Sequence, residues 1–214
     1  MEIEEIIKAA EQGNTKAQYN LGVCYLEGDG VEIDKSTAVS WFRKAAAQNY
    51  SKALYNLGVC YYKGDGVKKN RRIAILWYQQ AAALGHAKAQ YNLGCCYDFG
   101  DGIQQDKHIA IQWYRKAAEQ GYAKAQYNLG VCYTFGDGIR KNHKLAVEWY
   151  RKAAEQNNAN ALYNLGVCYM HGDGVKKNKD IALQLYIKAA EQGDINAKNV
   201  LQKLNINDYE NYKH

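Results

Sequence analysis

Residues 17–25 read Ala17-Gln-Tyr-Asn-Leu-Gly-Val-Cys-Tyr25, and this pattern returns four more times at intervals of 36 residues. A fixed period in this range is typical of stacked arrays in which each unit covers the apolar face of its neighbour. We therefore expect a single repeat domain over residues 1–205, whose function depends on its surface. Its repeats are predicted at 17–52, 53–88, 89–124, 125–160 and 161–196.

The first half of each repeat predicts an α-helix, called helix A. Ala17, Leu21 and Cys24 fall at i, i+4 and i+7, which places them on one stripe of a helix. Gly22 lies inside this helix, where it costs about 1 kcal/mol relative to alanine. Because it recurs in every copy, it predicts that another backbone approaches closely there. A Gly-Asp-Gly loop ends helix A, and its first glycine suits the left-handed conformation that follows a helix.

The second half of each repeat predicts helix B, with Ala38, Trp41 and Phe42 on one stripe. An Asp or Asn stands at the expected N-cap in every copy. The chain begins with a half-repeat at 2–16, which is a helix B with a polar outer face, as a terminal repeat requires. It ends with a capping helix at 197–205 and a loosely held tail at 206–214. The predicted N-caps are Asp34, Asn70, Asp106, Asn142 and Asn178.

Composition narrows the class of protein. The chain has 214 residues, 47% of them apolar, and a formal charge of +6 spread through all repeats. No apolar run approaches the roughly 18 residues that span a bilayer. The acidic stretch Met1–Lys8 does not resemble a secretory signal, so we expect a cytoplasmic protein or one exported without a cleaved signal.

Five of the six cysteines recur at one position of the repeat. Equivalent helices of adjacent repeats should lie about 8–10 Å apart, beyond the ~7 Å between Cα atoms that a disulfide tolerates. We therefore predict reduced, buried residues at Cys24, Cys60, Cys96, Cys132 and Cys168. Cys95 is different, because it replaces the valine of the other copies.

The pattern Ala-x-x-x-Leu-Gly-x-x-Tyr-x-x-Gly-x-Gly-Val, an Asp or Asn cap, and then Ala-x-x-Trp-Tyr-x-Lys-Ala-Ala closely resembles the Sel1-like repeat family, a relative of the tetratricopeptide repeats. The resemblance covers about residues 2–205. It implies an all-α, right-handed α/α superhelical solenoid of helix-turn-helix repeats, with helices A on the concave side. It also implies a non-catalytic protein-protein interaction scaffold or adaptor.

Two other functions stay open. One is a bacterial effector that engages host proteins. The other is a penicillin-binding or β-lactamase-like enzyme, as described for a cysteine-rich Helicobacter branch of the family. This chain departs from that branch, because alanines stand where the branch has its helix B cysteine: Ala46, Ala82, Ala118, Ala154 and Ala190.

Stepping along the other face of helix A from Lys16 gives a ladder of tyrosines and a ladder of lysines. Tyrosines offer rigid amphipathic contact area, and lysines pair with carboxylates or phosphates. We therefore predict a groove for a peptide or protein segment with acidic and apolar residues. The groove residues are Lys16, Tyr19, Val23, Lys52, Tyr55, Val59, Tyr62, Lys63, Lys88, Tyr91, Cys95, Asp98, Phe99, Lys124, Tyr127, Val131, Phe135, Tyr163, Val167, Met170 and His171.

A structural alternative remains for each of these residue types. The tyrosines could only pack between adjacent helices A, and the lysines could only be solvated. Asn20 and its equivalents, beside each tyrosine, are expected to bond the backbone of the neighbouring repeat rather than a peptide.

Motifs for catalysis are missing from the pattern. The histidines have no matching nucleophile or carboxylate spacing, and the Gly-Asp-Gly loops lack the acidic ligands of a calcium loop and the Gly-Lys-Ser/Thr of a phosphate loop. We expect no catalytic residues, metal or cofactor, no nucleic-acid or membrane partner, and a monomer.

Overall fold

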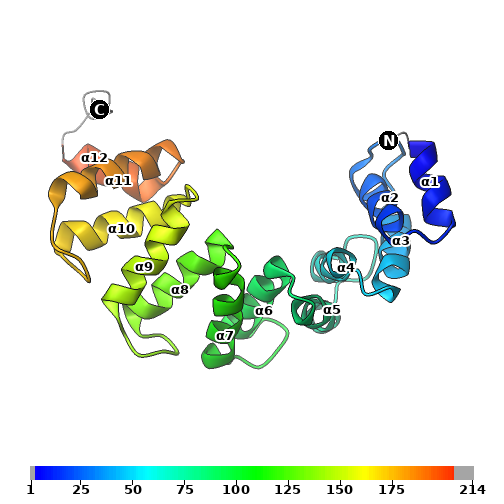
Figure 1. Cartoon of the computed structure of the whole chain (residues 1–214), viewed down its shortest axis with the longest axis horizontal. Coiled ribbons are helices and arrows are strands. Elements are labelled where there is room, and N and C mark those ends of the chain that lie inside the picture. Colours follow the sequence, from blue (N-terminus) through cyan, green and yellow to red (C-terminus); the bar gives the residue numbers. More distant parts are fainter. Residues whose placement is uncertain (1–2, 205–214) are drawn as a thin grey trace. The chain divides into compact units, whose positions relative to one another are not determined.

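The computed structural model describes residues 3–204, which form twelve α-helices (Figure 1). The predicted tail at 206–214 and the last residue of the predicted cap lie outside the described residues. The helices are α1 (Ile3–Glu11), α2 (Thr15–Glu27), α3 (Lys35–Ala47), α4 (Ser51–Lys63), α5 (Arg71–Ala83), α6 (Ala87–Phe99), α7 (Lys107–Glu119), α8 (Ala123–Phe135), α9 (His143–Ala154), α10 (Ala159–His171), α11 (Lys179–Glu191) and α12 (Ile195–Lys203).

Two compact units, residues 1–110 and 111–214, are described separately. In the first unit α2 packs on α3 and α4 on α5, and the pairs join through contacts of α3 with α4 and of α5 with α6. In the second unit α8 packs on α9 and α10 on α11 in the same way, and α9 contacts α10. The predicted class, all-α with helix-turn-helix repeats, is confirmed.

Both predicted helix signals are confirmed. At each helix B start, the predicted Asp or Asn side chain accepts a hydrogen bond from a backbone amide two or three residues later. At each helix A end, the glycine has a φ between 70° and 89°, which only glycine adopts readily. Helix A begins two residues before the predicted repeat start, at Thr15 in the first copy and Ser51 in the second.

The glycine inside helix A marks a close approach of the helix B backbone, as predicted, because a Cβ added at Gly22 would lie 3.1 Å from the carbonyl oxygen of Ala38. An aromatic side chain of the same helix B comes closer still. A Cβ added at Gly58 would lie 2.5 Å from the Tyr78 ring of the partner helix B, and one at Gly130 would lie 2.5 Å from the Tyr150 ring. The glycine therefore makes room for a buried aromatic side chain. That side chain lies in the core, since Tyr78 is only 2% exposed.

The second glycine of the Gly-Asp-Gly loop packs directly against the backbone of the preceding repeat. A Cβ at Gly66 would lie 2.1 Å from the carbonyl oxygen of Lys35, at the start of the preceding helix B. A Cβ at Gly174 would lie 2.3 Å from the carbonyl oxygen of His143. No side chain fits between these backbones, so each loop lies directly on the first turn of the previous repeat's helix B.

A buried glutamine in helix A adds a second tie between repeats. The amides of Gln18, Gln90 and Gln126 donate to carbonyl oxygens of the preceding helix B at 3.1–3.2 Å. Because a buried amide without a partner is costly, these bonds fix the register of neighbouring repeats.

A short helix packs at each end of the array, and the recurrent cysteines are reduced and buried as predicted. α1 packs on α2 and buries Ile6 and Ala10, while α12 packs on α11 and buries Ala197 and Leu201. The five recurrent cysteines are buried on helices A, whereas Cys95 is half-buried. Burial raises the pKa of the Cys60 thiol to about 11 and that of Cys96 to about 12, so both are protonated at neutral pH.

Candidate peptide-binding site

The predicted groove residues lie on helices A, where the lysines are exposed and the tyrosines half-buried. Phe99 and Phe135, from the variable pair that ends helix A, are 75% and 73% exposed. The other residue of the pair in α6, Asp98, forms an ion pair, since its carboxylate lies 3.9 Å from Lys107 Nζ in the first turn of α7. Large exposed aromatic side chains on otherwise half-buried faces are unusual and mark candidate contact positions.

The groove tyrosines have a structural role on one side. Tyr55 packs on Tyr78 with ring centroids 6.0 Å apart, and it also stacks at 4.7 Å on His86, the residue that caps the next helix A, α6. Tyr127 lies 6.1 Å from Tyr150 in the second unit. These rings therefore pack against helix B on one side, and their half-exposed remainder stays a candidate contact surface.

Asn56, Asn92 and Asn164, which stand beside groove tyrosines, bond the preceding repeat, but to a tyrosine hydroxyl instead of the expected backbone. Asn164 Nδ2 donates to the Tyr150 hydroxyl at 3.4 Å. Burial raises the pKa of Tyr55, and hydrogen bonding by Asn92 partly opposes this rise. Its position therefore serves to hold neighbouring repeats together.

In the first unit the groove residues of α4 and α6 surround one cavity of about 680 Å³. This volume is in the usual range for ligand sites. Six of its lining residues were predicted from the sequence, and they come from two consecutive repeats: Tyr55, Val59, Tyr62, Lys63, Cys95 and Phe99. The structure therefore brings together the variable residues Cys95 and Phe99 with the constant positions of the previous repeat.

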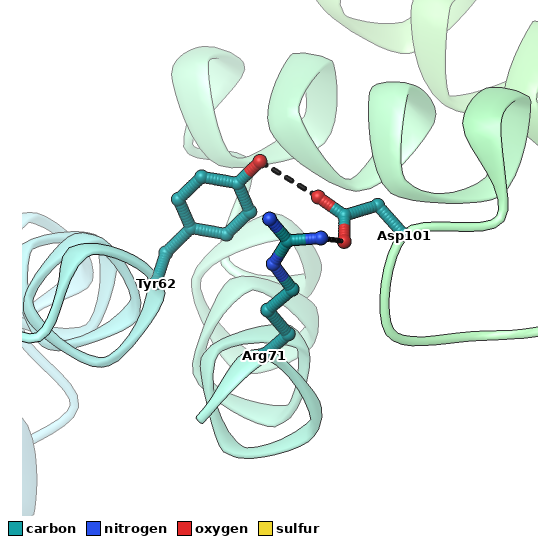
Figure 2. A network of polar contacts seen from close by, with 3 residues as sticks. All are labelled: Tyr62, Arg71 and Asp101. Atoms are coloured by element: carbon teal, nitrogen blue, oxygen red, sulfur yellow. Dashed lines mark hydrogen bonds and ion pairs between the residues drawn. The ribbon is translucent and has the colours of Figure 1, made fainter. Parts of the chain in front are cut away.

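The sequence did not reveal the polar wall of this cavity. Figure 2 shows the Tyr62 hydroxyl and the Arg71 guanidinium converging on the carboxylate of Asp101, which lies in the Gly-Asp-Gly loop after α6. Tyr62 donates to Asp101 Oδ2 at 2.7 Å, and Arg71 Nη1 pairs with Oδ1. The guanidinium also lies over the Tyr62 ring, 5.4 Å from its centroid.

A signal for this network existed in the repeat. The first residue of helix B stands 30 residues before the loop aspartate of the next repeat, and the first copy shows the same pair, Lys35 Nζ to Asp65 Oδ1 at 2.7 Å. A basic residue at the first position and an aspartate at this spacing therefore predict an ion pair between repeats.

The cavity is close to neutral apart from one lysine. Asp101 offsets the charge of Arg71, and the hydrogen bond to Asp101 raises the pKa of Tyr62, so this hydroxyl keeps its proton. Lys63 at the end of α4 is exposed and contributes the remaining positive charge. Apolar and aromatic walls with one cation suit a side chain or short segment that is apolar with an adjacent carboxylate.

Two absences hold for the described residues. Between residues 3 and 204, no three His, Cys, Asp or Glu side chains are grouped so that they could hold a metal ion. Within the same range, no helix is long and apolar enough to cross a membrane.

Consecutive helix pairs that pack on one another define an α-helical repeat protein. Five consecutive Sel1 repeats match residues 15–50, 51–86, 87–122, 123–158 and 159–194, and the chain belongs to the Sel1 repeat family. Proteins of this family are generally non-catalytic protein-interaction scaffolds. Each matched repeat begins two residues before the predicted one, with the same period.

Two bacterial proteins of solved structure are similar to this chain. A protective antigen of uropathogenic Escherichia coli with an SLR fold is 41% identical over 92% of this chain, with a TM-score of 0.89. The chain spans only 42% of that antigen. A Sel1 repeat protein from Oxalobacter formigenes is 39% identical, covers 89% of this chain and 76% of its own, and has a TM-score of 0.83.

The Helicobacter pylori cysteine-rich protein B is more distant. It is 28% identical over 63% of this chain and 97% of its own, with a TM-score of 0.50. A comparison with curated proteins found no match.

Proposed function

We propose that the protein is an interaction scaffold that binds a peptide segment through the cavity between α4 and α6. The segment places an apolar side chain in the cavity and an acidic residue near Lys63. The observation that carries this proposal is the convergence of six groove positions from two repeats on one cavity of about 680 Å³.

The apolar part of the proposal rests on the cavity walls. Val59 and Cys95 face the cavity from consecutive helices A, and Phe99 stands at its edge with 75% of its surface exposed. An exposed phenylalanine gains contact area only when a partner covers it, which stabilises by about 25 cal/mol per Å² of apolar surface buried.

The acidic part rests on uncompensated charge. Arg71 already has Asp101, so it serves as a fixed wall. Lys63 lines the cavity and makes no ion pair within residues 3–204. A carboxylate beside the apolar side chain would therefore meet this positive charge.

Selection from short displayed peptides, followed by fluorescence anisotropy with the selected sequences, tests this proposal. We expect peptides that combine a large apolar residue with Asp or Glu. Phe99→Ala and Lys63→Glu should each weaken binding at least tenfold, about 1.4 kcal/mol. Phe135→Ala is the matched control, because Phe135 is equally exposed on the second unit and does not line this cavity.

Helical content should be unchanged in all three variants, since the altered side chains lie at the surface. Selected peptides without acidic residues, or equal affinities for wild type and Phe99→Ala, would contradict the proposal.

A role outside the producing cell is the second candidate. The E. coli relative, 41% identical, is described as a protective antigen of uropathogenic strains. Detecting the protein in culture medium of intact cells tests this possibility, and strict retention in the cell fraction would exclude it.

A further inference from the structure

A second cavity, of about 430 Å³, lies in the second unit between α9, the end of α10 and the loop that leads into α11. Its polar lining consists of Arg151, Lys176, Lys177, Asn178 and the Tyr169 hydroxyl. Arg151 Nη2 donates to that hydroxyl at 2.8 Å. Among residues 3–204, no carboxylate lines this cavity, in contrast to the cavity of the first unit.

The same residues recur together at three places in the chain. We call such a set a basic junction: an arginine of helix B, and two cations followed by an asparagine in the loop of the next repeat. In each set the arginine donates to the loop-side tyrosine of helix A, at 2.7–3.1 Å. The basic junctions are Arg43, Lys68, Lys69, Asn70; Arg115, Arg140, Lys141, Asn142; and Arg151, Lys176, Lys177, Asn178.

At the other two places the whole set changes at once. Where the arginine is missing, both loop cations are missing as well, and the N-cap is an aspartate instead of an asparagine. We call these sets neutral junctions because they contain no cation, although each has an aspartate cap. They are Ile7, Glu32, Ile33, Asp34 and Gln79, Gln104, Gln105, Asp106. The four positions therefore vary as a unit within one chain.

Folding stability does not explain the basic junctions. Cations immediately before a helix are destabilising, because the partial positive charge of the helix N-terminus repels them. Asp caps a helix about as well as Asn, and beside three cations it would also supply a counter-charge. The sequence has the opposite arrangement. The uncharged Asn cap follows the two loop cations, whereas the acidic Asp cap occurs in the junctions without these cations.

The cations are also unpaired. Arg151, Lys176 and Lys177 form no ion pair with any carboxylate of the described part of the chain. The Asn178 side chain is occupied by the amides of Asp180 and Ile181, so the cap does not serve the cations. Arg151 uses one nitrogen for Tyr169, which orients the guanidinium and leaves its other donors for a ligand.

We infer that the cavity formed by Arg151, Lys176 and Lys177 binds a phosphate group, carried by a small molecule or by a phosphorylated side chain. The planar arginine gives paired hydrogen bonds to phosphate oxygens, and the two ammonium groups give charge. A phosphate dianion supplies the counter-charge that the chain itself leaves out. This site lies on other helices than the peptide cavity and does not depend on the proposed function.

The test uses the full chain with inorganic pyrophosphate as one probe and a phosphoserine peptide as the other. We expect saturable shifts of the amide resonances of residues 176–181 with at least one probe, while sodium chloride at equal ionic strength and the unphosphorylated peptide give none. Which probe binds identifies the source of the phosphate. Shifts that do not saturate, or that chloride reproduces, would overturn the inference.

The chain provides its own control variant. Arg151→Gln with Lys176→Gln and Lys177→Gln copies the neutral junction at Gln79, Gln104 and Gln105, which this fold already accommodates. The triple variant should fold and lose at least tenfold in affinity at residues 176–181. Equal affinity in the folded triple variant would overturn the inference.

A gain of binding completes the test. Gln79→Arg, Gln104→Lys, Gln105→Lys and Asp106→Asn together convert the neutral junction into a basic one beside Tyr97. Saturable shifts at residues 104–109 would support the inference, and their absence in a folded variant would contradict it.

Discussion

The arginine of the first cavity forms an ion pair, whereas the arginine of the second cavity does not form one within residues 3–204. In the first unit Arg71 is held by Asp101, which also accepts a hydrogen bond from Tyr62. In the second unit Arg151 donates to the neutral Tyr169 hydroxyl and forms no ion pair in the described part of the chain, and two lysines line the same cavity. The same residue type thus serves as a neutralised wall in one place and as an exposed positive charge in the other.

The cavities also differ in depth. The wall of the first includes the core residues Tyr78 and Cys96, 2% and 4% exposed. The charged residues of the second are all exposed. Changes to the first cavity should therefore alter stability together with binding, whereas changes to the second should alter binding alone.

The largest expected effect on stability comes from Tyr78, which belongs both to the core and to the wall of the first cavity. Tyr78→Ala should lower the free energy of unfolding by about 3–5 kcal/mol, as for other large-to-alanine changes in cores, and should abolish peptide binding. Tyr150→Ala should cost a similar amount because Tyr150 is 1% exposed, although it lines neither cavity. Urea unfolding measures both, and a loss below 1 kcal/mol for Tyr78→Ala would show that this wall is not part of the core.

Removal of the neutralising carboxylate should make the first cavity resemble the second. Asp101→Asn leaves Arg71 unpaired and should cost about 1–2 kcal/mol in urea unfolding. The matched change Asp173→Asn should stay within about 0.5 kcal/mol, since Asp173 forms no ion pair in the described part of the chain. Equal costs for the two variants would remove the distinction between the units.

Acid should weaken the first unit through His86. Burial lowers the pKa of His86, and Lys88 and Lys52 lower it further. The unfolded chain therefore takes up this proton first, so stability is fully present above the unfolded pKa of about 6.5 and declines as the pH falls toward the lower folded pKa. Protonation would also remove the Nδ1 acceptor that binds the Ala89 amide at 3.2 Å.

His86→Asn provides the control for this pH effect. Asn158 occupies the equivalent position in the second unit and caps α10 without a titrating group. The melting temperature of the variant should fall less than that of the wild type between pH 7.5 and pH 5. An identical decline in both proteins would assign the effect to other groups.

Only a small stability effect is expected at the basic junction. Arg151→Gln, Lys176→Gln and Lys177→Gln together should change the free energy of unfolding by less than about 1 kcal/mol, because relief of charge near the helix N-terminus offsets the lost Tyr169 hydrogen bond. Thermal unfolding at low salt measures this change. A loss of several kcal/mol would mean that the cations are structural.

Local signals made most of the fold predictable. The glycine and Asp or Asn caps act within a few residues, so the pattern located the helices to within about two residues at their starts. Six residues that line the first cavity were also predictable, because they recur on the same face of each helix A.

Contacts across repeats were not predictable in the same way. The pairing of Arg71 with Asp101 depends on how one helix pair lies on the next, which no single repeat contains. Tyr78 was assigned to the core by its position, and the pattern could not show that one edge of its ring also borders a cavity. The close approach at Gly66 likewise depends on the backbone of another repeat.

The way in which loops lie on the preceding helix B has a consequence for how such genes lengthen. A tandem duplication of the segment 151–186 would copy an arginine together with its own lysines and asparagine, so the new copy would inherit a complete basic junction. Duplication of 159–194 would instead set the copied Lys176 and Lys177 opposite Ile187. The heritable unit of this surface therefore starts in the middle of a helix, and the point of recombination decides whether a longer array gains a charged pocket or only another pair of helices.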